Sequence, residues 1–260
     1  MTDAFTVTRE AGVFHLTLHR GKANAIDAAT SRLMGDAFAG FRDDPDLRVA
    51  LISSGNPKFF SAGWDLAAAA AGESPDADYG VGGFAGLQQL PGLNKPVIAA
   101  IHGICVGGGF ELALSADLIV AASNTRFSLP EIKAGTLADA ATLRLPRRIP
   151  YHIAMDLLFT GRWMEADEAA RWGLVGELVA SEHLLTRARE IATLLAAGPP
   201  LVFAAIKEVL RETDGQAFAP ALARIAARQL PTVATLYGSE DQLEGPRAFA
   251  EKRAPVWKGR

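Results

Sequence analysis

Short apolar runs recur along this chain, and each leads into a loop and then into a segment with helical patterning. The runs lie at 49–52, 97–101, 118–121 and 175–179. Parallel strands joined by helical crossovers have this pattern, and a hydrophobic content of 49% over 260 residues is enough to bury a large core. We therefore expect an α/β fold.

The N-terminal part predicts a hairpin followed by a helix. Residues 5–9 and 13–19 alternate apolar and polar side chains on either side of a short turn, so the hairpin would begin the sheet. Asp27 is suited to cap a helix over 28–43, which Pro45 would stop.

Residues 67–91 interrupt the pattern with an alanine run and a cluster of turn formers and acids, which predicts a mobile, exposed excursion. Beyond Ser181 the chain looks helical, with segments at 182–197, 201–213, 216–236 and 239–251. We expect a core over 1–195 and a helical C-terminal module over 196–260, whose apolar faces favour packing between subunits.

Composition excludes several classes of function. The single cysteine, Cys105, lies in an apolar run, which excludes an internal disulfide and suits a reducing cytoplasm. A net charge of −3 gives no general attraction to nucleic acid. The first residues lack the features of a signal peptide, and no apolar stretch reaches the length of about 18 residues that a membrane helix needs. His15 and His19 have no third ligand nearby in sequence, so we expect no metal site.

Three consecutive glycines, Gly107 to Gly109, stand directly before Phe110 and Glu111. Glycines leave the backbone open to a ligand, and a helix that starts there turns unpaired N–H groups and the positive end of its dipole outward. This arrangement could form an oxyanion hole. A flexible turn or a tight contact between a helix and a strand is the alternative.

A second loop, residues 59–66, also places small residues before a helix start, so the N–H of Trp64 could join that of Gly108 on one oxygen atom. Losing one such donor typically costs about 3 kcal/mol of transition-state stabilisation. Glu131 follows Glu111 by about one helix and one returning strand, so the two carboxyl groups could face each other across a cleft. Apolar neighbours would raise both pKa values and suit acid–base chemistry, although a single glutamate is more often solvated surface.

These motifs, in this order, resemble the crotonase superfamily, also called the enoyl-CoA hydratase/isomerase family. The resemblance rests on segments 61–66, 95–100, 107–112, 129–131 and 249–253. It implies a spiral of ββα units over 1–195, followed by a C-terminal module that mediates trimerisation and completes the CoA site. It also implies trimers paired into hexamers, a cytoplasmic enzyme, and no cofactor beyond the coenzyme A of the substrate.

Carried over by position, the resemblance implies that the N–H groups of Trp64 and Gly108 bind the thioester oxygen. Glu111 would activate water for attack at Cβ, and Glu131 would deliver a proton to Cα. The residues expected to contact the acyl-CoA are Lys22, Ala23, Ala25, Ala62, Gly63, Asp65, Leu66, Phe84 and Lys252, with Arg253 as a further candidate for the phosphates.

Keeping two glutamates favours a hydratase, which is a lyase, over an isomerase. A narrower resemblance, in segments 63–66, 75–80, 82–87, 107–114 and 255–260, implies reversible hydration of crotonobetainyl-CoA to L-carnitinyl-CoA. Trp64, Tyr79 and Phe84 could hold the trimethylammonium group on their aromatic faces, or could simply pack the loop onto the core.

Two alternatives stay open. The first is a general short-chain enoyl-CoA hydratase. The second is a silent acyl-CoA-binding protein, because residues 135–143 have alanines where family members have glycines, and these could crowd the site.

Overall fold

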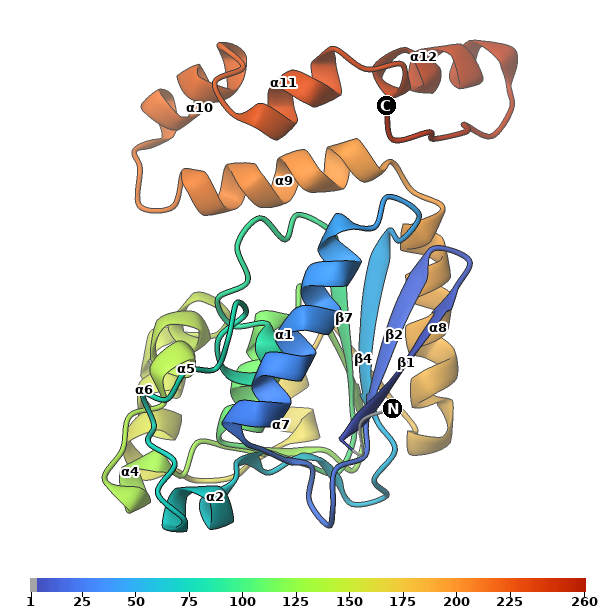
Figure 1. Ribbon diagram of the computed structural model, residues 1–260. Coiled ribbons are helices and arrows are strands. Elements are labelled where there is room, and N and C mark those ends of the chain that lie inside the picture. The colour runs from blue at the N-terminus through green and yellow to red at the C-terminus, as the bar shows by residue number, and fades with distance from the viewer. Residues whose placement is uncertain (1–3) are drawn as a thin grey trace.

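The computed structural model describes residues 4–260 and has an α/β fold built around a six-stranded sheet (Figure 1). β1 and β2 pair in an antiparallel manner as the predicted hairpin, and the other neighbouring strands of this sheet are parallel. In spatial order the strands are β1 (Phe5–Glu10), β2 (Val13–Leu18), β4 (Val49–Ser54), β7 (Val97–Ile101), β9 (Leu118–Ala122) and β12 (Glu177–Val179).

A second, smaller sheet completes the repeated units. β7 and β9 are each followed by a short strand and then by a helix, and β4 by two short strands and a helix, which is the ββα repeat that the resemblance implied. The short strands are β5 (Phe59–Ser61), β8 (Ile104–Val106) and β10 (Arg126–Ser128), joined by β11 (Met164–Glu165), and the helices are α2 (Leu66–Ala70), α3 (Gly108–Ser115) and α4 (Glu131–Ala134). Three residues are too few to show alternation, so sequence patterning missed these strands.

Helices cover both faces of the main sheet (Figure 1). On one face, α1 (Ala28–Asp43) begins where predicted, with the Asp27 carboxylate accepting the Thr30 N–H at 2.7 Å. On the other face, α8 (Leu184–Ala196) packs against the alternate side chains of the strands. The remaining helices of this part are α5 (Asp139–Arg144), α6 (Tyr151–Thr160) and α7 (Ala166–Arg171).

The C-terminal helices lie above the sheets in Figure 1 and have a small apolar cluster of their own. They are α9 (Pro200–Glu212), α10 (Phe218–Ala226), α11 (Pro231–Tyr237) and α12 (Asp241–Glu251). The predicted single helix over 216–236 is wrong, because Arg228 has a φ of 52° and Pro231 starts a new helix. The division at residue 195 stays a prediction. Within residues 4–260, no single helix is long and apolar enough to cross a membrane. One bent pair of helical segments, 181–196 with 200–212, has the length and apolar composition of a membrane span, and these are the only two features that suggest one.

The excursion over 67–91 is only partly exposed. Residues 82 and 83 and 85–87 are buried, and the short turn η1 (Phe84–Gly86) packs on α1. The contact is close, since an ideal Cβ at Gly86 would lie 2.3 Å from the Gly35 nitrogen. Expecting an exposed loop here was therefore wrong for its second half, because glycines on both sides let the backbones touch.

Candidate active site

The predicted glycine turn joins β8 to α3. Gly107 has φ 57° and ψ −132°, a conformation that side chains disfavour, and its carbonyl accepts the N–H groups of Phe110 and Glu111 at 2.8 and 3.0 Å. Gly108 is the first residue of α3, so its N–H belongs to the turn that has no carbonyl partner within the helix. The backbone donor predicted at Gly108 therefore stands at a helix start.

The second predicted donor belongs to β6 (Gly63–Trp64), which pairs in parallel with β3 (Ala25–Ile26). Asp65 N–H donates to the Ile26 carbonyl at 3.0 Å, and because successive N–H groups of a strand point to opposite sides, that of Trp64 points away from β3. An ideal Cβ at Gly63 would lie 2.5 Å from the Gly108 nitrogen. The two donor segments are thus in direct contact.

Both segments line one pocket, which also contains the two predicted glutamates. Its aromatic side includes Tyr79 and Phe84, whose ring centroids lie 5.5 Å apart in an edge-to-face arrangement. The lining residues are Trp64, Pro75, Tyr79, Phe84, Gln88, Gly108, Glu111, Glu131, Thr136, Leu137 and Asp139. The fold therefore brings the backbone donors, the acids and the aromatic rings to one place.

Glu111 is buried in α3, with 8% of its surface exposed, and both of its carboxyl oxygens have partners. Oε1 accepts the Ala141 N–H at 3.0 Å, and Oε2 accepts the Gln88 amide at 3.2 Å. Burial raises the pKa of Glu111, and these two donors oppose that rise. Hydrogen bonds of this kind favour the ionised carboxylate.

Glu131 begins α4, and its environment is different. Its Oε2 is buried without a hydrogen-bond partner, and an ideal Cβ at Gly107 would lie 3.0 Å from its Oε1. Burial, followed by the negative charges of Glu111 and Asp139, raises the pKa of Glu131 to about 7. One pocket thus holds two buried carboxyl groups with raised pKa values, one held by two hydrogen-bond donors and the other with no partner for its Oε2.

None of the alanines of the loop at 135–143 is among the residues that line the pocket. Thr136, Leu137 and Asp139 line the pocket, whereas Ala138 and Ala141 turn into the hydrophobic core. Instead, α5 contributes the Ala141 N–H to Glu111. The effect of this loop on turnover and on the choice of substrate stays a prediction.

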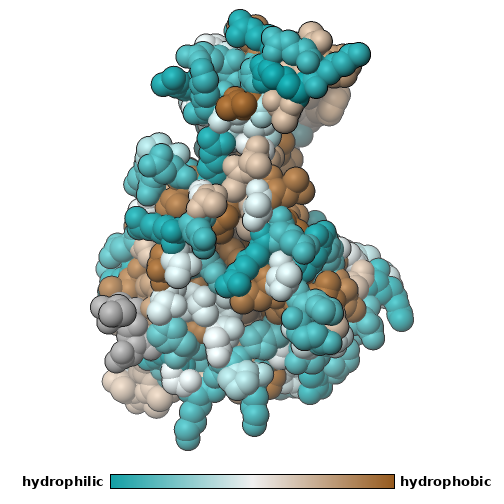
Figure 2. Space-filling model, turned by 90° about the vertical axis from the view of Figure 1, so that its right-hand side faces the viewer, coloured by the Kyte–Doolittle hydropathy of each residue, from teal (hydrophilic) through white to brown (hydrophobic). Residues whose placement is uncertain are grey.

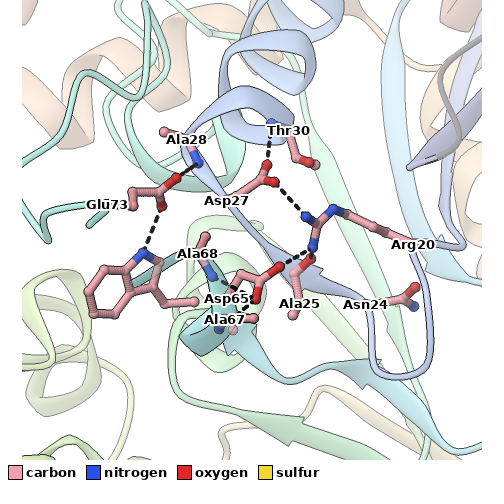
Figure 3. Close-up of polar contacts among 12 residues, drawn as sticks. Arg20, Asn24, Ala25, Asp27, Ala28, Thr30, Asp65, Ala67, Ala68 and Glu73 are labelled. Carbon is pink, nitrogen blue, oxygen red and sulfur yellow. Dashed lines mark hydrogen bonds and ion pairs between the residues drawn. The ribbon is translucent and has the colours of Figure 1, made fainter. Parts of the chain in front are cut away.

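The expected CoA-side loop is tied to the oxyanion segment by Arg20 (Figure 3). Its guanidinium donates to Asp65 at 2.6 Å, to Asp27 at 2.5 Å and to the Ala25 carbonyl at 2.7 Å. Asp65 also caps α2 by accepting the N–H groups of Ala67 and Ala68. The Ala25 carbonyl and the Asp65 carboxylate are therefore engaged within the protein, and the proposed contacts of these two residues with the substrate stay predictions.

The other expected binding residues are spread more widely. Ala62 N–H donates to the Ala23 carbonyl at 2.9 Å, and Ala62 directly precedes Gly63 in the chain. Lys22 is exposed, and Leu66 is 72% exposed at the start of α2. Lys252 follows α12 among the C-terminal helices and is not among the residues that line the pocket.

Arg253, the further candidate for the phosphates, forms ion pairs with Glu244 and Glu251. Its guanidinium is therefore engaged by carboxylates of the same chain.

Residues 8–260 match the family model described as enoyl-CoA hydratase/isomerase. The chain belongs to this family. It is 53% identical to the carnitinyl-CoA dehydratase of Salmonella typhi, with 100% of each chain covered, and 52% identical to that of Salmonella paratyphi C over the same extent. Among solved structures, it resembles an enoyl-CoA hydratase from Mycobacterium tuberculosis with a TM-score of 0.89 and 38% identity, with 100% of each chain covered. A Geobacillus kaustophilus structure covers 100% of this chain and 98% of its own at a TM-score of 0.90 and 32% identity.

Sequence reasoning missed Gln88 in this enoyl-CoA hydratase/isomerase family member. Its side chain donates to Glu111, and its carbonyl accepts from Arg144 at 2.8 Å. Arg144 also donates to Ser115, whose hydroxyl donates to the Glu111 carbonyl at 2.9 Å. Gln88 donates to a glutamate 23 positions away, and no local sequence motif predicts a hydrogen bond of that kind, so only the fold could reveal it.

Replacing Gln88 by leucine is expected to lower kcat about tenfold, because a hydrogen bond to a charged group contributes about 1.5–3 kcal/mol. Without this donor the pKa of Glu111 rises further, so the acidic limb of the pH–rate profile moves to higher pH. Profiles of wild type and variant should be compared with Gln89→Leu, a change at the exposed neighbouring glutamine. A variant that loses rate with no movement of the acidic limb would contradict this role.

Proposed function

We propose that this family member catalyses the reversible addition of water to crotonobetainyl-CoA, giving L-carnitinyl-CoA. The observation that carries the reaction type is the pair of unequal glutamates, Glu111 and Glu131, in one pocket with two backbone donors. The identity of the acyl group is supported by the relatives named carnitinyl-CoA dehydratase, which match over the full chain.

In the proposed hydration, the N–H groups of Trp64 and Gly108 bind the thioester oxygen, where negative charge develops as the nucleophile adds. The oxygen of a water attacks Cβ while Glu111 takes one of its protons. Glu131 then donates its proton to Cα, and the enolate returns to the thioester. Dehydration runs through the same steps in reverse, so no cofactor is needed beyond the coenzyme A of the substrate.

The proposed mechanism predicts one pH profile for both directions. The two glutamates must together hold one proton, and hydration neither releases nor takes up a proton overall, so kcat/KM changes in parallel for hydration and dehydration. Since the pKa of Glu131 is about 7, both values are expected to fall as pH rises through neutrality, where the pair loses its proton. Rates that stay level from about pH 6 to pH 8 would contradict this assignment.

The rival acyl specificity is that of a general short-chain enoyl-CoA hydratase, which the likeness to the solved Mycobacterium tuberculosis enoyl-CoA hydratase favours. The three aromatic side chains of the pocket, Trp64, Tyr79 and Phe84, support a cationic acyl group, because aromatic faces attract quaternary ammonium ions. The deciding experiment compares kcat/KM of the purified protein on crotonobetainyl-CoA and crotonyl-CoA. A clear preference for crotonobetainyl-CoA is expected, and equal values would support the general hydratase instead.

We further propose a homotrimer, or a dimer of trimers, located in the cytoplasm. Large apolar side chains on the C-terminal helices support association, with Phe218 81%, Leu210 68% and Phe249 88% exposed. Figure 2 also shows hydrophobic side chains near the narrow neck between these helices and the core. The buried free thiol of Cys105 suits a reducing compartment.

A further inference from the structure

Glu73 holds the indole of Trp64 at the pocket wall. Its Oε1 accepts the Trp64 Nε1–H at 2.8 Å, and its Oε2 accepts the Ala28 N–H at 2.9 Å, at the start of α1. Figure 3 shows the Glu73 carboxylate beside Ala28 at that helix start. Because both oxygens are engaged, the negative charge is fixed at the edge of a ring that lines the pocket.

Among the residues that the structure describes, this carboxylate has no cationic partner. Within residues 4–260, no lysine, arginine or histidine nitrogen forms an ion pair with Glu73, whereas Asp27 and Asp65 nearby share Arg20. Burial, followed by the negative charges of Glu73 and Asp76, raises the pKa of Tyr79, so the charge of Glu73 also acts on a second aromatic side chain that lines the pocket. The residues that line the pocket include three acids and no lysine, arginine or histidine.

A glutamine could accept the indole N–H equally well, so this hydrogen bond alone does not require a charge. The negative charge would matter for a cation bound over the face of Trp64, because the ring quadrupole and the Glu73 carboxylate would both attract that cation. A neutral acyl chain would gain nothing from it. The arrangement therefore separates two classes of substrate that share the same reacting atoms.

We propose that Glu73 is a specificity-determining residue, whose carboxylate at the indole edge of Trp64 selects acyl-CoA esters with a quaternary ammonium group over neutral ones. This inference rests on the proposed function and deepens it. The Glu73 carboxylate adds a negative charge beside the three aromatic rings of the pocket, Trp64, Tyr79 and Phe84, which carry no charge by themselves.

The test measures kcat/KM on crotonobetainyl-CoA and on crotonyl-CoA for Glu73→Gln and takes the ratio. The ratio is expected to fall about tenfold, because only the cationic ester loses an attraction. Asp78→Asn is the matched control, since it removes an exposed charge from the same loop, and it should change the ratio by less than about twofold.

A second variant, Glu73→Asp, separates charge from support. Aspartate keeps the negative charge but is too short to hold both N–H groups, so it should retain more of the ratio than Glu73→Gln does. If Glu73 only supports Trp64 and α1, Glu73→Asp should have lower kcat/KM values than Glu73→Gln, and the values for the two esters should fall equally. That result overturns the inference, and so does a ratio that Glu73→Gln leaves unchanged. A wild-type protein that treats the two esters alike overturns the proposed substrate and this inference together, whereas a wild-type preference that Glu73→Gln leaves intact overturns this inference alone.

Discussion

Replacing Glu131 by glutamine is expected to lower kcat for hydration about a thousandfold, within the range that a positioned proton donor contributes. The amide keeps the shape of the side chain but has no proton to give to Cα. Burial and the nearby acids hold the pKa of Glu131 at about 7, so it is the carboxyl group best suited to donate near neutral pH. KM should change little, because the thioester still binds to the backbone donors.

The measurement is steady-state hydration monitored by loss of the enoyl thioester absorbance, together with binding of the CoA ester. Glu165→Gln is a suitable control, since its side chain is 61% exposed and pairs with Arg126 at the surface. Wild-type turnover by the Glu131 variant would remove this residue from the reaction. Loss of ester binding alongside turnover would instead indicate a damaged pocket.

Replacing Gly63 by alanine is expected to lower kcat/KM at least about a hundredfold, which is the effect of losing one oxyanion donor. Gly63 has a φ of 81°, and an added Cβ would lie 2.5 Å from the Gly108 nitrogen and 2.8 Å from the Val106 carbonyl oxygen. These are backbone atoms, so β6 and α3 must move apart. The strain should also cost about 1–3 kcal/mol of folding stability.

Gly40→Ala is the matched comparison. Gly40 lies inside α1, nothing stands within 4 Å of its ideal Cβ position, and alanine there should raise the free energy of unfolding by about 1 kcal/mol. Activity and melting temperature of both variants decide the question. A Gly63 variant with normal turnover would show that the two donor segments need not touch.

Local signals predicted much of the fold, and they failed where distant residues decide the structure. The cap at Asp27 lies within one turn of the helix it starts, so its sequence was sufficient. The three-residue strand β8 depends on pairing with β5 and β10, which are remote in sequence. The break near Arg228 follows a continuous apolar pattern, and only Pro231 hinted at it.

Some residues of the candidate site could likewise be predicted from sequence motifs, and others could be found only from the fold. Gly108, Glu111 and Glu131 lie in motifs that family resemblance can align, and the structure brings them into one pocket. Gln88 and Glu73 were missed because their hydrogen-bond partners are distant in sequence or lie on other elements. A glutamine or glutamate in a loop has no periodicity or spacing that would distinguish it from solvated surface.

Arg20 has a consequence for how the molecule opens. One guanidinium joins the capping carboxylates of α1 and α2, so neither helix start can detach without breaking contacts that also hold the other. The two helix starts are therefore expected to have the same free energy of local unfolding, because they open together as a single cooperative unit. The backbone donor at Trp64 lies within this unit, so Arg20, which does not line the pocket, helps to keep that donor in place against local unfolding.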